Sequence, residues 1–256
     1  MNIQLEIGLG LLLYFTLWYL FTTLIKNAGL IDIGWGLGFV LLSTYVQLRM
    51  QMNWGWLLWG MVSLWGIRLA LHIGRRNLGK AEDYRYAQFR KDWGKTFWLR
   101  AYVQLFLFQG LLMGIIAQSY LEGQSHAVPM YPLLMGIGSL LFILGFWMEA
   151  EADASLKRHI QDPQNKGHLI QTGLWAISRH PNYLGESILW LGIALTSIGL
   201  GGPIWSLLGF ITISLIIRYV SGVPLLEKRL MKYPEYSEYI RKVPIFIPFI
   251  QPKGGS

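Results

Sequence analysis

Cysteine is absent from the 256 residues, so disulfides and thiolate metal sites are excluded. The chain also lacks the short motifs of soluble nucleotide-binding and zinc enzymes. It has no Gly-x-Gly-x-x-Gly after a strand, no Walker lysine loop and no His-Glu-x-x-His. We therefore expect no metal site, and any nucleotide must be bound by helices and loops.

Charged residues are also scarce, at 14% of the chain against 53% apolar residues. Apolar runs near the ~20 residues that cross a bilayer recur along the sequence, which indicates a membrane protein. The net charge of +8 would suit a nucleic-acid partner on a soluble basic surface. Here the charges lie between apolar runs, so membrane topology explains them better and no nucleic-acid partner is expected.

The apolar runs predict an all-α, polytopic membrane helical bundle of about seven transmembrane helices, with residues 1–256 forming a single domain. The predicted spans lie near residues 8–25, 33–48, 54–73, 101–119, 131–150, 183–200 and 203–221.

Lysine and arginine are unevenly distributed between the connections. Eight of them lie within residues 73–100, whereas residues 119–130 and 199–203 contain none. Because short cytoplasmic loops collect basic residues, this pattern predicts an N-terminus outside and a C-terminus in the cytoplasm. The cytoplasmic segments would be loops at about 73–100 and 151–180 and the tail 222–256, with amphipathic interfacial helices in the first.

Ionisable residues at or near the cytoplasmic ends of the predicted spans include Asp32, Arg68, Glu149, Glu186 and Arg218. A charge at the centre of a membrane helix costs roughly 2.5–3.5 kcal/mol, so each of these residues needs a partner or a polar cavity. Their common depth favours a polar pocket open to the cytoplasm. The alternative is structural ion pairing, for example Asp32 with Arg68 or Glu149 with Arg218.

Two features near this pocket suggest a ligand. Glu149 and Asp153 are four residues apart and share a helix face. They would accept hydrogen bonds from ribose hydroxyls or a carboxamide, or would neutralise Lys157 and Arg158. Basic residues around the pocket mouth suit a phosphorylated nucleotide, or reflect lipid contact and topology alone. These residues are Arg75, Arg76, Lys157, Arg158 and Arg179.

The stretch from Ser178 to Glu186 places arginine, histidine, asparagine, tyrosine and glutamate at a predicted helix start. Pro181 suits the first turn, whose unpaired N–H groups favour an anion or a carboxamide oxygen. Asn182 and Tyr183 supply polar contacts, while His180 alone is more often a structural residue. We expect this stretch to hold a cofactor.

Several motifs along nearly the whole chain resemble those of the bacterial DUF1295 proteins, relatives of the steroid 5α-reductases and, more remotely, of isoprenylcysteine carboxyl methyltransferases. The carriers are Asp32 to Gly36, Trp65 to Leu69, Glu82 to Tyr86, Gly173 to Trp175, Ser178 to Glu186, Ser221 to Pro224 with Glu227, and Tyr236 to Pro248. The resemblance implies an integral protein of the bacterial inner membrane.

The likeness to the 5α-reductases implies a seven-helix enzyme that binds NADPH from the cytoplasmic side and transfers a hydride to a conjugated double bond of a lipophilic, steroid-, isoprenoid- or lipid-like substrate. The cofactor contacts that this likeness implies are Asn182, Glu186, Glu149, Asp153, Arg68, Arg76, Asn77 and Arg218. The stretch from Ser178 to Glu186 adds Arg179 and His180 as candidate cofactor contacts. Membrane lipid would be a further partner.

The sequence departs from the reductases where the proton donor is expected. Their Gln-Glu pair has no counterpart, and the reductase tyrosine three residues before Arg68 is Trp65 here. Gly222 replaces a histidine. Reduction of an enone needs a general acid at the carbonyl oxygen. The catalytic candidates are Glu186, Tyr183, Tyr84, Tyr86 and Asp32, the last as a residue that polarises a tyrosine.

Two alternatives remain. An S-adenosylmethionine-dependent methyltransferase would share the Arg-His-Pro-x-Tyr-x-Gly stretch, although a single Glu227 stands where those enzymes usually show paired glutamates. A non-catalytic lipid-binding protein would use the intramembrane charges only for structural pairing.

Overall fold

The computed structural model describes residues 2–126 and 128–246, and every regular element within these ranges is helical. Seven helical segments there are long and apolar enough to cross a membrane, as the sequence predicts. They comprise Ile3–Ile25, Ala28–Met50, Gly55–Asn77, Tyr84–Leu121, Pro132–Gln161, Pro181–Leu200 and Ile204–Leu230. The chain is therefore an integral-membrane helical bundle.

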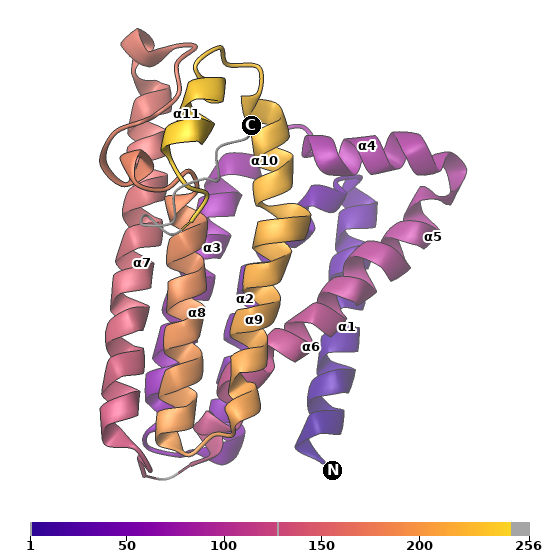
Figure 1. The fold of residues 1–256 in the computed structure, drawn as a ribbon. Coiled ribbons are helices and arrows are strands. Elements are labelled where there is room, and N and C mark those ends of the chain that lie inside the picture. Colours follow the sequence, from indigo (N-terminus) through magenta and orange to yellow (C-terminus); the bar gives the residue numbers. More distant parts are fainter. Residues whose placement is uncertain (1, 127, 247–256) are drawn as a thin grey trace.

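The helices follow one another up and down the bundle (Figure 1). Helices α1 (Ile3–Ile25), α2 (Ile31–Met50) and α3 (Gly55–Asn77) are followed by α4 (Tyr84–Trp93), which lies across one end. The chain then descends through α5 (Phe97–Ala101), a π-helical turn at Tyr102–Leu107 and α6 (Phe108–Leu121). Helix α7 (Pro132–Gln161) ascends and α8 (Pro181–Leu200) descends beside it.

The last span is α9 (Leu207–Ile216), which passes through a π-helical turn at Ile217–Ser221 into α10 (Val223–Leu230). Helix α11 (Tyr236–Lys242) lies over α8 at the same end as α4 and α10, opposite the start of α1 (Figure 1). We call this end, which carries the Arg68, Arg85 and Arg179 ion pairs, the polar end. Its cytoplasmic location stays a prediction, and residues 247–256 of the predicted tail lie outside the described residues.

Two predicted connections are more helical in the structure. Helix α7 continues to Gln161, so the connection predicted at 151–180 begins only at residue 162. The reason lies in residues 150–156, where three alanines, Glu151 and Leu156 are good helix formers. Thirty residues at 1.5 Å each extend about 45 Å, longer than the ~30 Å hydrocarbon layer. The predicted loop at 73–100 contains α4. Asp83 caps the start of this helix, because its side chain accepts a hydrogen bond from the Arg85 N–H.

Glycines at seven-residue intervals bring α7 and α8 into backbone contact. A Cβ on Gly185 would lie 2.7 Å from the Gly145 carbonyl oxygen, and one on Gly192 would lie 2.6 Å from that of Gly138. Gly199 would meet the Met135 backbone at 2.4 Å. Lipid gives membrane helices no hydrophobic drive toward association, so they associate through close packing. Small residues such as glycine allow the two backbones to approach this closely. This glycine seam fixes which faces of α7 and α8 oppose each other.

An alanine scan of α7 tests the glycine seam. Gly138→Ala places a methyl group against Thr196 and Gly192 of α8, whereas Gly136→Ala on the same helix meets nothing within 4 Å. We expect Gly138→Ala to lose about 1–3 kcal/mol of stability through overpacking. Gly136→Ala should be neutral or stabilising. Thermal unfolding in detergent measures both, and equal melting temperatures would contradict the seam.

Candidate functional site

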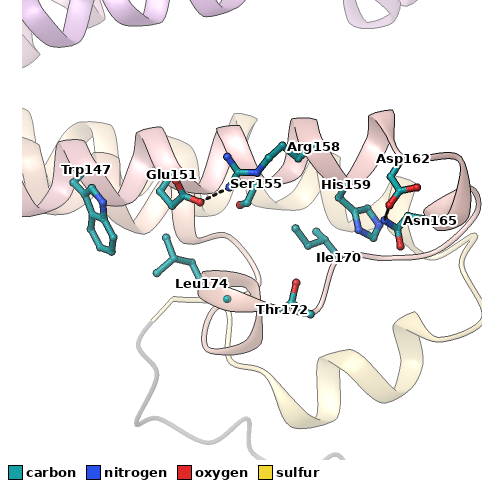
Figure 2. A pocket seen from close by; sticks show the side chains of 11 residues that line it. Trp147, Glu151, Ser155, Arg158, His159, Asp162, Asn165, Ile170, Thr172 and Leu174 are labelled. Carbon is teal, nitrogen blue, oxygen red and sulfur yellow. Dashed lines mark hydrogen bonds and ion pairs between the residues drawn. The ribbon is translucent and has the colours of Figure 1, made fainter.

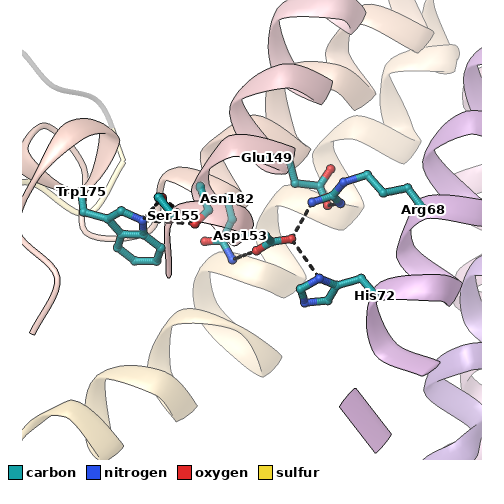
Figure 3. A network of polar contacts seen from close by, with 8 residues as sticks. Arg68, His72, Glu149, Asp153, Ser155, Trp175 and Asn182 are labelled. Carbon is teal, nitrogen blue, oxygen red and sulfur yellow. Dashed lines mark hydrogen bonds and ion pairs between the residues drawn. The ribbon is translucent and has the colours of Figure 1, made fainter. Parts of the chain in front are cut away.

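Arg68 of α3 bridges two acids of α7 at the polar end (Figure 3). Its Nη1 donates to Glu149 Oε1 at 2.5 Å, and its Nη2 donates to Asp153 Oδ2 at 2.5 Å. Both acids are largely buried, and the Arg68 side chain is 16% exposed. The four-residue spacing of the acids places them on one face of α7, where a single guanidinium reaches both.

Helix α8 brings Asn182 and Glu186 to the same place. Asn182 Nδ2 donates to Asp153 Oδ1 at 3.2 Å. Glu186 lies close enough to interact electrostatically with Glu149, Asp153 and Arg68. The glycine seam explains this proximity, since a Cβ on Gly185, next to Glu186, would lie 2.6 Å from the Glu149 backbone nitrogen. We call Arg68, Glu149, Asp153, Asn182 and Glu186 the Arg68 network.

His72 also belongs beside this network, although the sequence analysis did not select it. Its Nδ1 lies 3.7 Å from Asp153 Oδ2 (Figure 3). His72 is four residues after Arg68, so the same helix-face spacing that paired Glu149 with Asp153 could have identified it.

Two buried acceptors of the network, Glu149 Oε2 and Asn182 Oδ1, receive no hydrogen bond from residues 2–126 and 128–246. An unsatisfied buried polar atom costs about 1–3 kcal/mol, so each is a place where a ligand donor would be favourable. Trp65, three residues before Arg68 on α3, and Trp190, four residues after Glu186 on α8, are buried edge to face at 4.9 Å, with Phe39 against both. One helical turn from the network, α3 and α8 are therefore joined by a buried aromatic group.

A second cluster joins the start of α8 to α10. Glu227 Oε1 lies 3.0 Å from Arg179 Nη1 and 3.3 Å from His180 Nε2. His180 is 1% exposed and stacks on Tyr183 with ring centroids 5.6 Å apart. The backbone N–H of Arg179 donates to the Pro244 carbonyl at 2.9 Å, which ties the segment after α11 to this cluster. Glu227, which appeared only among the family motifs, is the residue that holds Arg179 and His180 together.

Asp32 lies in a third cluster, with α4. Tyr86 Oη donates to Asp32 Oδ1 and Arg85 Nη2 to Asp32 Oδ2, both at 2.6 Å. The predicted contact of Asp32 with a tyrosine is therefore present. Tyr183 connects this cluster to the Arg68 network, because Arg85, Glu186 and Asp153 all interact with it electrostatically.

The remaining predicted site residues lie at the same end without joining the Arg68 network. Arg76 is exposed and bonds Asn77 Oδ1 at 3.1 Å, while Asn77 Nδ2 is a buried donor without an acceptor. Arg218 lies over the Tyr219 ring and interacts electrostatically with His180. Tyr84 is half-exposed, and the Arg229 guanidinium lies over its ring.

The sequence suggested ion pairs whose partners differ from those in the structure. Arg68 pairs with Glu149 and Asp153, whereas Asp32 pairs with Arg85. Arg158 pairs with Glu151 rather than with Asp153. The glycine seam and the position of α4 determine which charges meet, and neither follows from depth along the helices.

A sequence model described as "Protein of unknown function (DUF1295)" matches residues 18–243, most of the chain. The chain belongs to the DUF1295 family. The match includes the three clusters described above, so this DUF1295 protein carries them within the family's shared region. No solved structure matches the chain.

Relatives of this DUF1295 protein include an uncharacterized protein of Schizosaccharomyces pombe, 29% identical in a 213-residue alignment that covers 73% of this chain and 61% of that protein. A protein-S-isoprenylcysteine O-methyltransferase of Saccharomyces cerevisiae is 35% identical over 44% of this chain and 48% of its own length. A probable O-methyltransferase of Ustilaginoidea virens is 32% identical over 33% and 28%. The aligned regions thus cover less than two thirds of each relative.

Removing Arg68 tests the energetic role of the network. Arg68→Met leaves Glu149 and Asp153 without their shared cation. Uncompensated buried charge typically costs about 3–5 kcal/mol, so the melting temperature in detergent should fall strongly. Adding Glu149→Gln and Asp153→Asn to Arg68→Met should recover part of the loss. A decrease no larger than that of Arg241→Met on α11 would contradict the assignment.

The pH dependence of stability tests His180. Burial lowers the pKa of His180, outweighing the opposite effect of Glu227. Stability from a neutral buried histidine is fully present above its unfolded pKa of ~6.5 and is lost as pH falls through the lower folded pKa. The melting temperature should therefore decrease from pH 7 to pH 5, and His180→Gln should flatten this decrease. The exposed His168→Gln should leave the slope unchanged; an equal slope in His180→Gln would refute the role.

Proposed function

We propose that the protein is a membrane-embedded methyltransferase that uses S-adenosylmethionine and acts on a carboxylate of a lipophilic substrate. The Arg68 network would be its cofactor pocket. Two relatives that carry the name O-methyltransferase support this proposal. The Arg179–His180–Pro181 stretch with Tyr183, held by Glu227, is the part of the site that resembles such enzymes.

The charge balance of the Arg68 network carries the proposal. The network brings three acids together: Glu149 is buried, Asp153 and Glu186 are partly buried, and the Arg68 guanidinium bonds only Glu149 and Asp153 among them. A buried excess of negative charge favours a cationic ligand, and S-adenosylmethionine has a sulfonium and an ammonium group.

The sequence predicts that basic residues around the pocket mouth bind a phosphorylated ligand, but some of these residues already have partners in the structure. Arg179 is paired with Glu227, and Arg158 with Glu151. Paired guanidiniums have less attraction left for phosphate. Arg76 Nε donates to the neutral Asn77 and interacts electrostatically with Asp83.

The unpaired atoms of the site match the groups of this cofactor. Glu149 Oε2 and Asn182 Oδ1 need donors, which an ammonium group or ribose hydroxyls would supply. When bound, S-adenosylmethionine supplies an electrophilic methyl group. The chain's own task is then to hold the cofactor with Arg68, Asp153, Asn182 and Glu186 and to keep water from it.

A carboxylate acceptor also removes the need for a proton donor. Methylation of a carboxylate consumes no proton, whereas reduction of an enone needs a general acid. Two of the tyrosine candidates suit that role poorly, since Tyr86 Oη donates to Asp32 and the half-exposed Tyr84 ring lies beneath the Arg229 guanidinium.

NADPH-dependent reduction is the second candidate, and one observation favours it. Asn182, Asp153, Glu149, Arg68 and Glu186 come together as the reductase resemblance implies. Such a site would pass a hydride to a double bond of a lipophilic substrate, with Tyr183, which interacts electrostatically with Glu186 and Asp153, as the candidate acid.

Thermal-shift measurements in detergent compare the two cofactors. We expect S-adenosylmethionine to stabilise the protein, by about 2.7 kcal/mol at a 100-fold excess over Kd, and NADPH and NADH to have no effect. Stabilisation by NADPH alone would replace methyl transfer with reduction. Stabilisation by none of them would favour a non-catalytic lipid-binding protein.

Site variants then locate the binding. Asn182→Ala and Glu186→Gln should weaken cofactor affinity by about tenfold or more, because each removes a buried polar contact. Glu238→Gln on α11, at a highly exposed position, is the matched control. Unchanged affinity in both site variants would place the pocket elsewhere.

A further inference from the structure

A cavity of about 610 Å³ lies between α7 and the segment that follows it (Figure 2). Trp147, Glu151, Ser155 and Arg158 of α7 line one side, and Asn165 and Thr172 line the other. It lies outside the Arg68 network, because Glu149 and Asp153 on α7 face α3 and α8. The proposed methyl transfer does not use this cavity.

The cavity continues a lipid-facing stripe of α7. Leu140, Leu144 and Trp147 are 67%, 46% and 55% exposed, and their spacing of four and three residues places them on one face. The same spacing leads on to Glu151, Ser155 and Arg158 inside the cavity. Since α7 is about 45 Å long, its last turns extend beyond the hydrocarbon layer, and Trp147 lies where interfacial tryptophans are found.

The mouth of the cavity carries charge of both signs. Arg158 Nη2 lies 2.5 Å from Glu151 Oε1, and the two side chains are 66% and 40% exposed. Asp162 accepts hydrogen bonds from the Gln164 N–H and from Asn165 Nδ2. An exposed ion pair contributes little to the stability of the protein, so Glu151 and Arg158 can exchange each other for a ligand of matching charges.

We propose that this cavity binds the headgroup of a phospholipid with a primary amine, phosphatidylethanolamine, whose acyl chains lie along Leu140, Leu144 and Trp147. Arg158 binds the phosphate, and Glu151 accepts from the ammonium group. A quaternary ammonium has no N–H to donate, and an anionic glycerol headgroup brings no cation to Glu151 when Arg158 binds the phosphate.

Native mass spectrometry of the full chain tests this lipid site. The protein is presented with phosphatidylethanolamine, phosphatidylcholine and phosphatidylglycerol of identical acyl chains. We expect retention of phosphatidylethanolamine about tenfold above the other two, as one charge-assisted hydrogen bond allows. Equal retention of either other lipid would overturn the amine specificity. Equal competition by soluble glycerophosphoethanolamine would overturn the role of the acyl chains.

Charge-removing variants locate the lipid. Glu151→Gln and Arg158→Gln should each reduce retention about tenfold. The matched controls are Glu238→Gln and Arg241→Gln on α11, which make the same chemical changes away from the cavity. Because Glu151 and Arg158 are exposed, their variants should keep the wild-type melting temperature. Unchanged retention in both would remove the lipid from this cavity.

Discussion

The backbone contact between α7 and α8 is the constraint on which the site depends. Gly138 and Gly145 on α7 meet Gly192 and Gly185 on α8 so closely that a single methyl group would collide with backbone atoms. Such contact leaves little freedom for one helix to rotate against the other. The acids of α7 and the amide of α8 are consequently held on facing surfaces, and Asn182 reaches Asp153.

Once these faces are opposed, electrostatics accounts for the composition of the site. Three acids within a poorly solvated bundle end need cations, and Arg68 supplies one for two of them. Negative charge remains, and among the described residues no donor reaches Glu149 Oε2 or Asn182 Oδ1. A ligand that carries hydrogen-bond donors and positive charge would therefore stabilise the site. The Glu227 cluster positions the start of α8 from the other side.

Much of this arrangement was predictable from the sequence, because it follows from quantities local to the chain. Apolar run length identified seven spans, and depth along those spans identified Asp32, Arg68, Glu149, Glu186 and Arg218 as residues of one end. Helical spacing was sufficient to align Glu149 with Asp153, and Pro181 indicated where α8 begins.

The partners of these residues were not predictable in the same way. Which acid Arg68 meets depends on the rotation of α3 against α7, which no local pattern encodes. Asp32 meets Arg85 because α4 lies across the polar end. The sequence of α4 alone does not determine the direction in which this helix runs. The glycine spacing was visible in the sequence, and the seven-residue interval could have indicated the α7–α8 contact in advance.

Hydrogen–deuterium exchange with and without S-adenosylmethionine tests the central claim, that the Arg68 network and the start of α8 form one cofactor pocket. The N–H groups of Asn182 and Tyr183 belong to the first turn of α8 and have no acceptor within the helix, so a bound ligand should protect them. The account predicts slower exchange at residues 149–153 and 181–186 together. Protection confined to other segments would contradict it.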